Sequence, residues 1–326
     1  MLTHLADVTL KSGEAMQVLK TTAPEPAWVD RIIPFLIHKG AEWLDAMRQA
    51  YTDGIDGLLM NDYLGVLASG EVVGNITTVE SLGCGILQHV FTPERHRRQG
   101  IATSIMESLC RDFATRDGRA LYLGTGYDTH PYHIYASFGF VGRGDSGKMT
   151  WLRDPVFLSS WFAPGAVTVR ATEWADWPRL EALYATSGQW QLKCQLQNYY
   201  GHAGYESGYI DLRRRMTEGT VSSVRVMEST AGAVVGHALL APQSEWGGRS
   251  LQLDFLVHAN FYAHIGDLLD TLDIPTDTRV VCYCDENAKA RMVALEQLGF
   301  EWEGTLRKQI QDENHQPLDV MVFARV

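Results

Sequence analysis

Residues 92–103 read TPERHRRQGIAT, a basic turn that runs into a glycine. Arg97 and Arg98 can neutralise phosphate charge with their guanidinium groups. Gly100 and Ala102 add little bulk over the backbone amides that would open a following helix. Because the first four amides of a helix lack internal partners and carry the positive end of its dipole, phosphate oxygens bind there without a metal. The stretch therefore predicts a pyrophosphate site.

The flanking sequence predicts a strand before this turn and a helix after it. Residues 85–91 are rich in β-branched and aromatic side chains and follow a Gly-Cys-Gly break. After the turn, apolar residues recur every four positions, as on the buried side of a helix over residues 101–115: Ile101, Ile105, Leu109 and Phe113. Strand, basic turn and helix thus follow one another along the chain.

A second motif follows in the same order along the chain. Residues 120–124 predict another strand, and residues 130–138 predict a helix that stops at Gly139, after which Phe140 begins the next strand. Together, Arg97-x-x-Gly100-x-Ala102 and Tyr135-x-x-x-Gly139-Phe140 resemble the two signature motifs of the GNAT superfamily, the acyl-CoA-dependent N-acetyltransferases. The resemblance covers roughly residues 14–153.

The resemblance implies an α/β fold in which a mixed, mostly antiparallel twisted sheet is flanked by helices. It also implies acetyl-CoA as co-substrate, with no metal, held by the turn and the start of the helix: Arg97, Arg98, Gln99, Gly100, Ile101, Ala102 and Thr103. Gln99, Ile101 and Thr103 would act mainly through backbone amides. A nucleic-acid patch or a solvated basic turn would explain the charge, but neither explains the glycine spacing or the flanking elements.

The resemblance also implies catalytic roles. The family stabilises the tetrahedral oxyanion with a backbone amide on the strand before the cradle, where a bulge frees an N–H. Here that residue is Val90 or Phe91, because Pro93 lies seven residues before Gly100 where the family has six. Tyr135 matches the general acid that protonates the departing thiolate; the alternative is an ordinary amphipathic tyrosine on a core helix.

The general base has two candidates, and the family sometimes uses water alone. His89 has an ordinary pKa of ~6.5, suited to proton transfer near neutrality. Strand alternation predicts that it shares a face with Leu87 and Phe91, so it could equally be a hydrogen-bonded core histidine. Glu80 follows the predicted strand 72–79, where a solvated charge at a strand end is the competing interpretation.

The composition argues against nucleic acid, metal and export. The net charge of −11 disfavours general nucleic-acid binding and leaves a cationic acceptor open. The five cysteines form neither a metal-ligand spacing nor an even disulfide set, and His130 and His133 lack further ligands of convincing spacing. No apolar signal core or stretch of ~18 apolar residues occurs. We therefore expect a cytoplasmic protein with no membrane partner; its oligomeric state is not set by the sequence.

The chain contains a diverged internal repeat. Leu298-Gly299-Phe300 repeats Phe138-Gly139-Phe140 after 160 residues, and a strand followed by a helix opens each half, at residues 16–51 and 167–185. The sequence therefore predicts two GNAT-like domains in tandem: a catalytic domain at 1–153, a linker at 154–165 and a degenerate domain at 166–326.

The second copy lacks the chemistry of the first. The offset of 160 places Leu295 where the first half has Tyr135, and the strand 251–257 leads into a segment without arginine. We expect the second half to be structural or to shape the acceptor site. The expected walls of that site are residues 28–43, residues 124–130 and the aromatic-rich residues 190–209.

Two function classes follow from the sequence. The first is an N-acetyltransferase that moves an acetyl group from acetyl-CoA to the primary amine of a small molecule by direct attack in a ternary complex. The second is a non-catalytic protein that binds acyl-CoA and acts as a sensor or scaffold. The presence of Tyr135 favours the enzyme.

Overall fold

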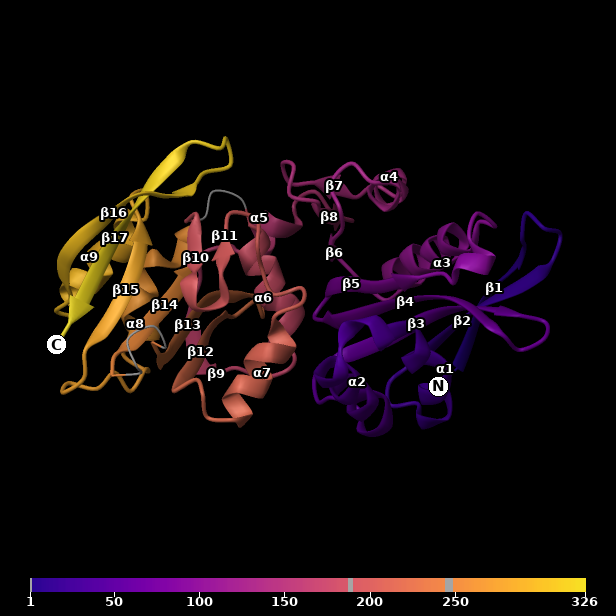
Figure 1. Ribbon diagram of the computed structural model, residues 1–326, viewed down its shortest axis with the longest axis horizontal. Coiled ribbons are helices and arrows are strands. Elements are labelled where there is room, and N and C mark those ends of the chain that lie inside the picture. The colour runs from indigo at the N-terminus through magenta and orange to yellow at the C-terminus, as the bar shows by residue number, and fades with distance from the viewer. Residues whose placement is uncertain (1, 187–189, 244–248) are drawn as a thin grey trace. The chain divides into compact units, whose positions relative to one another are not determined.

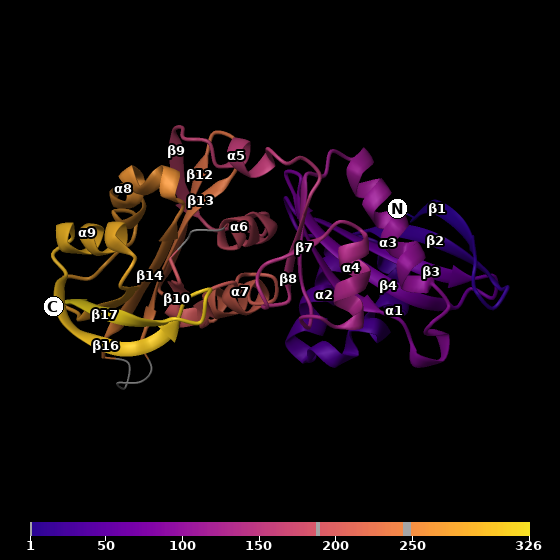
Figure 2. The same ribbon diagram turned by 90° about the horizontal axis from the view of Figure 1, so that it is seen from above.

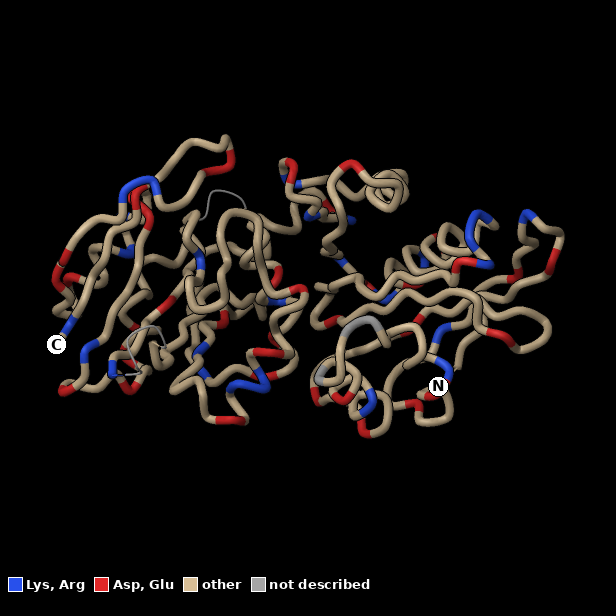
Figure 3. Tube along the Cα trace, viewed as in Figure 1, with Lys and Arg blue, Asp and Glu red and all other residues tan. Residues whose placement is uncertain are grey.

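The structure is a computed structural model that describes residues 2–186, 190–243 and 249–326 (Figure 1). The chain divides into two compact units, Met1–Phe157 and Leu158–Val326. The division falls inside the short helix α5, Phe157–Trp161, within the segment expected to be a linker. Each unit holds one large sheet of mixed strand orientation flanked by helices, and the second unit also has a two-stranded sheet of Leu192–Cys194 and Tyr199–Tyr200. Acidic and basic residues are interspersed over both units (Figure 3). The α/β fold class is therefore confirmed.

The first sheet has the strand order β1-β2-β3-β4-β5-β6-β8-β7. Every neighbouring pair is antiparallel except β5 and β6, which are parallel. The strands are β1 Leu2–Thr9, β2 Ala15–Thr22, β3 Leu59–Leu67, β4 Val72–Ser81, β5 Cys84–Phe91, β6 Ala120–Gly124, β7 Val141–Gly142 and β8 Lys148–Leu152. The helices are η1 Pro26–Trp28, α1 Val29–Ile32, η2 Ile33–Lys39, α2 Ala41–Asp53, η3 Glu94–His96, α3 Ile101–Thr115 and α4 His130–Ser137.

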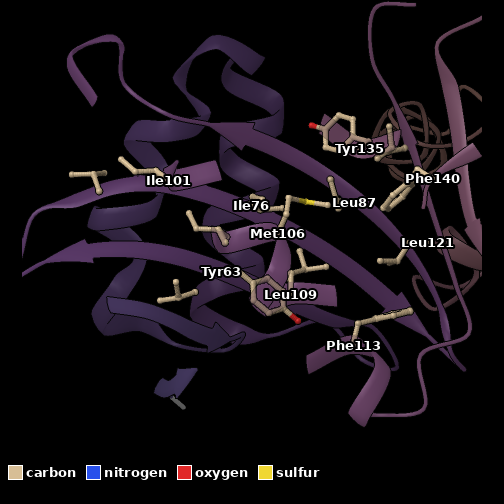
Figure 4. Close-up of a cluster of buried hydrophobic side chains, with 14 of the residues drawn as sticks. Tyr63, Ile76, Leu87, Ile101, Met106, Leu109, Phe113, Leu121, Tyr135 and Phe140 are labelled. Atoms are coloured by element: carbon tan, nitrogen blue, oxygen red, sulfur yellow. The ribbon is translucent and has the colours of Figure 1, made fainter. Parts of the chain in front are cut away.

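Helix α3 packs its apolar stripe on one face of this sheet. The four residues that recur along α3 are buried against side chains of β3, β4 and β5, among them Tyr63, Ile76 and Leu87 (Figure 4). Close approach depends on Gly74, because a Cβ there would lie 2.6 Å from Ile101 Cγ2. The predicted helix over 101–115 is confirmed, since its period of about four matches the helical repeat.

Short helices contact the other face. The region expected to be helical from residue 28 to 51 is divided into α1, η2 and α2, and Pro34 lies at the start of η2. Phe35 of η2 contacts Phe91 of β5, with 5.9 Å between ring centroids, and Trp43 of α2 contacts His89 at 5.1 Å. The residues at the end of β5 therefore meet the helices opposite to α3.

The second sheet has the order β16-β17-β15-β14-β13-β12-β9, and its one parallel pair is β14 and β15. Helices α6 and α7 lie on one face, with α8 and α9 on the other (Figure 2). The strands are β9 Val167–Ala171, β12 Ser223–Ser229, β13 Val234–Pro242, β14 Leu251–Val257, β15 Val280–Asp285, β16 Glu301–Gln311 and β17 Pro317–Arg325. The helices are α6 Asp176–Ala185, α7 Tyr209–Thr217, η6 Ala259–His264, α8 Ile265–Leu269 and α9 Lys289–Gln297.

The aromatic segment 190–209 is not an open loop. It contains β10 Leu192–Cys194, η4 Gln195–Gln197 and β11 Tyr199–Tyr200. Trp190, Tyr205 and Tyr209 are buried inside the second unit, where Tyr205 contacts Tyr209 with 6.0 Å between ring centroids. The expectation that these aromatic residues wall an acceptor cleft is therefore wrong for Tyr205 and Tyr209, which build the hydrophobic core of their own unit, whereas Trp190 lines a pocket of that unit beside Tyr262.

Candidate active site

Strand β5 carries a bulge next to its end. Thr77 of β4 pairs with Gln88, but Asn75 pairs with Phe91, so β5 holds one residue more than β4 over this interval. His89 lies in the bulge with a φ of +55°, in the left-handed region that side chains other than glycine seldom adopt. A bulge changes the direction of the backbone and side chains that follow it, so the ladder is interrupted between Gln88 and Phe91 and resumes at the pair of Phe91 and Asn75.

The bulge corrects one prediction about His89. Regular alternation placed His89 on the same face as Leu87, but Leu87 packs under α3 whereas the imidazole of His89 contacts Trp43 of α2. The extra residue interrupts the alternation of side chains along β5, so residues before and after the bulge cannot be assigned to faces of the sheet by one regular alternation. His89 is 7% exposed and therefore nearly buried.

The parallel strands β5 and β6 separate before the bulge. Their pairing runs from Cys84 opposite Ala120 to Ile86 opposite Tyr122, and no later pair joins them among the described residues. Val90 and Phe91 thus lie on a stretch of β5 that is paired to β4 but has left β6. This divergence is the place where the backbone of β5 can meet a bound molecule.

The basic turn has the geometry of an anion site. Arg98 has a φ of +64° and Gly100 a φ of +88°, and Gly100 directly precedes the first helical residue, Ile101. Turns that contain left-handed residues can present backbone N–H groups to an anion, and this turn lies next to the positive end of the α3 dipole. A Cβ on Gly100 would meet no atom within 4 Å, so the space above the turn is open.

The arginines of this turn differ in their partners. Arg95 donates to Glu71 Oε1 at 2.6 Å, and His96 Nε2 lies 3.1 Å from the same oxygen. The hydrogen bond from Arg95, and next in size the one with His96, lower the pKa of the Glu71 carboxyl. Arg97 donates from Nε to the carbonyl of Thr92 at 3.2 Å. The side chains of Arg97 and Arg98 are exposed at the turn, where an anionic ligand can reach them.

Tyr135 lies in α4 beside the diverging strands. It is 6% exposed, and its ring packs 6.0 Å from that of Phe140. Its carbonyl accepts the N–H of Phe140 at 3.2 Å, and Gly139 with a φ of +90° ends the helix. Figure 4 shows Tyr135 at the end of the core cluster near Leu87, with its hydroxyl pointing away from Phe140.

Glu80 is an internal ion-pair partner. It is 5% exposed, and Arg116 donates to Oε2 at 2.7 Å and to Oε1 at 3.1 Å. Asn61 and Thr78 donate to Oε1 as well, at 3.0 and 2.5 Å. The interpretation of Glu80 as a solvated charge at a strand end is wrong, because β4 continues to Ser81 and carries the side chain inward.

A buried carboxylate that the sequence analysis missed lies on the opposite face. Asp62 of β3 is 0% exposed and accepts hydrogen bonds from Thr77 Oγ1, at 2.6 Å, and from the hydroxyl of Tyr51. Burial raises its pKa to about 6, although these hydrogen bonds act in the other direction. The sequence pattern that could have revealed it is Met60-x-Asp62-x-Leu64. Alternation along a strand places this acid on the same face as two apolar side chains.

Metal and membrane features were sought in the part of the chain that the structure describes. No group of three or more His, Cys, Asp and Glu side chains there could hold a metal ion. His133 pairs instead with Asp128, with 3.0 Å between Nε2 and Oδ1. Within the same described ranges, no helix combines the length and the apolarity needed to cross a membrane.

Residues 30–140 match the acetyltransferase (GNAT) family model. The GNAT match contains the bulge, the basic turn, α3 and Tyr135. Members of this family are acetyltransferases, so the match supports acetyl transfer as the general reaction of this domain. No curated protein matches the chain.

Solved structures similar to this chain include GNAT-type enzymes. A ribosomal-protein-alanine N-acetyltransferase from Brucella melitensis is 23% identical, with 49% of this chain and 99% of that chain covered and a TM-score of 0.39. An N-acetyltransferase from Staphylococcus aureus Mu50 is 16% identical over 49% and 98%, with a TM-score of 0.41. A GNAT superfamily phosphinothricin acetyltransferase from Sinorhizobium meliloti, in complex with AcCoA, is 15% identical over 49% and 87%, with a TM-score of 0.38.

Proposed function

We propose that the first unit is an N-acetyltransferase that transfers an acetyl group from acetyl-CoA to the primary amine of a small molecule, by direct attack in a ternary complex. The observation that carries this proposal is the bulge at His89. It lies where β5 has left β6, and the same GNAT match contains the open basic turn at Gly100 and the nearly buried Tyr135. In this proposal the basic turn binds the coenzyme, a backbone amide after the bulge stabilises the oxyanion, and Tyr135 protonates the leaving group.

The proposed reaction uses three parts of this site. Arg97, Arg98 and the first amides of α3 bind the pyrophosphate of acetyl-CoA. The amine nitrogen attacks the thioester carbon, and a backbone amide of Val90 or Phe91 stabilises the oxyanion. As the carbon–sulfur bond breaks, Tyr135 donates its phenolic proton to the thiolate.

We propose His89, or water beside it, to accept the proton of the amine. Its imidazole is of the residue type most often used for proton transfer near neutrality, and it lies in the bulge itself. Glu80 is a weaker candidate because Arg116, Asn61 and Thr78 already occupy its oxygens. We therefore propose a structural role for Glu80, which joins β4 to the end of α3.

We propose further that the second unit is a degenerate copy that takes no coenzyme. Its helix α9 ends as α4 does: Leu295 accepts the N–H of Phe300 at 3.0 Å, and Gly299 has a φ of +78°. Leucine, however, has no proton to give to a thiolate. Beyond β14, η6 and the five-residue α8 replace the long α3 and its basic turn.

The divergence of β14 and β15 is filled by the chain itself. Their parallel pairing stops after Gln252 and Val281, and β10 contacts both strands. Leu192 of β10 donates its N–H to Asp285 at 3.0 Å and accepts from Arg291 at 2.9 Å. Arg291 also pairs with Asp254 at 3.0 Å, and both are fully buried. These contacts support a structural rather than a coenzyme-binding role for this unit.

The test of the proposed function is amine-dependent thiol release from acetyl-CoA by the full chain, over a panel of primary amines, together with thermal stabilisation by coenzyme A alone. Release with at least one amine and stabilisation by coenzyme A support the enzyme. Stabilisation without release for any amine would favour the second candidate, a non-catalytic acyl-CoA-binding protein. Absence of stabilisation would contradict both.

A further inference from the structure

The bulge at His89 is a strained feature that the surrounding structure must hold. A residue with a side chain in the left-handed region costs on the order of 1 kcal/mol or more, so it persists only where its neighbours over-determine it. His89 has a φ of +55°. Groups on the neighbouring strands must therefore hold the backbone of the bulge in place.

A chain of buried polar groups reaches the bulge from the two neighbouring strands. Asn75 of β4 donates from Nδ2 to the carbonyl of His89 at 3.4 Å and to Thr77 Oγ1 at 3.3 Å. Thr77 donates in turn to Asp62 of β3 at 2.6 Å, and Tyr51 of α2 donates to the other oxygen of Asp62. The chain therefore links α2, β3 and β4 to the backbone of the bulge.

This chain is costly to keep. Asp62, Asn75 and Thr77 are each 0% exposed, and a buried carboxylate lowers stability unless its hydrogen bonds compensate for lost hydration. Burial raises the pKa of Asp62 to about 6, which is the thermodynamic sign of that cost. Three apolar side chains of similar size would avoid the cost of burying a carboxylate. Stability alone therefore does not explain why polar side chains occupy these positions.

We propose that Asp62, Thr77 and Asn75 are positioning residues, which hold the His89 bulge so that the backbone amide after it meets the thioester oxygen. This inference rests on the proposed acyl transfer. None of the three touches a reacting atom in this account; they act through the carbonyl of His89. Asp62 anchors Thr77, Thr77 and Asp62 orient the amide of Asn75, and Asn75 fixes the bulge.

The neighbouring residue Thr78 offers a matched control. Thr77 and Thr78 are both 0% exposed, and each donates its hydroxyl to a buried carboxylate. The partner of Thr78 is Glu80, on the face of the sheet that carries α3, and its hydrogen bonds lead to Arg116 instead of the bulge. Replacing either threonine by valine keeps the shape and removes one hydroxyl.

The experiment compares T77V, T77S and T78V in the full chain. Two quantities are measured: hydrogen exchange of the amides at residues 89–91, and kcat for acetyl transfer alongside the affinity for coenzyme A. We expect T77V to speed exchange at 89–91 at least tenfold and to lower kcat at least tenfold, with coenzyme A affinity within twofold of wild type. T77S should restore both values, and T78V should leave both near those of wild type.

The outcomes separate this inference from the proposed function. Equal exchange at 89–91 in T77V and T78V overturns the positioning role, whether or not the protein transfers acetyl groups. Normal kcat in T77V, with wild type active, overturns it as well, and so does a loss confined to T78V. If wild type releases no thiol with any amine, the proposed function fails, and faster exchange in T77V alone would show that the chain holds the bulge without serving acyl transfer.

Discussion

Arg116 donates hydrogen bonds to both carboxylate oxygens of Glu80, at 2.7 and 3.1 Å, and so connects the end of α3 to strand β4. Arg116 also donates to Asp112 at 2.8 Å and to the hydroxyl of Tyr63 at 3.0 Å. The hydrogen bond from Lys20 and then that from Arg116 lower the pKa of Asp112, although burial opposes them. This cluster connects α3, the helix that begins at the basic turn, to the sheet that carries the bulge.

The first prediction concerns E80Q. E80Q removes the charge of one of the two carboxylates that pair with Arg116, which keeps Asp112 as a partner, and we expect a loss of about 1.5–3 kcal/mol in the free energy of unfolding. The kcat of the folded fraction should stay within threefold of wild type, because Glu80 is not the proposed base. Urea unfolding and steady-state kinetics below the melting temperature measure the two effects. A hundredfold loss of kcat with unchanged stability would restore Glu80 as a candidate base.

The second prediction concerns pH and Asp62. Its pKa is raised from 3.8 to about 6 in the folded protein. Between these values the folded state keeps a proton that the unfolded state loses, so this group adds stability as pH falls from about 7 to about 4. The full effect is about 3 kcal/mol at 1.36 kcal/mol per pKa unit, of which about 2 kcal/mol falls between pH 4.5 and 7. We expect D62N to lack this component when urea unfolding is compared at pH 4.5 and 7. Identical pH dependence in both proteins would contradict the assignment.

The third prediction concerns G74A. The added Cβ would lie 2.6 Å from Ile101 Cγ2 and 3.0 Å from Ile105 Cδ1, so α3 must shift at its start. We expect a loss of about 1–3 kcal/mol in stability, as for other overpacked cores. Coenzyme A affinity should fall as well, because Ile101 begins the helix beside the anion turn. G304A is the matched control, since its Cβ would meet no atom within 4 Å.

The fourth prediction concerns the anion turn. Hydrogen bonds to charged groups contribute ~1.5–3 kcal/mol, so the double variant R97A/R98A should lower the affinity for coenzyme A at least tenfold. The salt dependence of binding should also weaken. R95A is the control, because Arg95 is already paired with Glu71. Calorimetric titration at two salt concentrations measures both. Equal losses in the double variant and in R95A would argue against a site built on Arg97 and Arg98.

Local patterns predicted much of the fold, and the limits have a physical cause. Helix α3 and strands β9 and β14 have the expected bounds, because amphipathic periodicity and breaks in the chain are local signals. The resemblance implied a bulge on this strand, but local patterns did not place it at His89, since an extra residue on β5 is defined only against the register of β4. The group of Asp62, Thr77 and Asn75 was missed for the same reason: its members come from two strands and meet only in the sheet.

The fifth prediction concerns Tyr135. Replacing a general acid typically costs ~10² to 10⁴ in turnover, and Y135F keeps the ring that packs on Phe140. We expect coenzyme A affinity and melting temperature to remain near the wild-type values. Tyr132 lies on the same helix and is partly buried, so Y132F is the matched control and should retain activity.

The most direct test of the account is the rate of thiol release from acetyl-CoA by the full chain, with the best amine of a panel, in wild type, Y132F and Y135F. The account predicts amine-dependent release in wild type and Y132F, and a rate at least a hundredfold lower in Y135F at saturating coenzyme. An unchanged rate in Y135F, or no release by wild type with any amine, would contradict it.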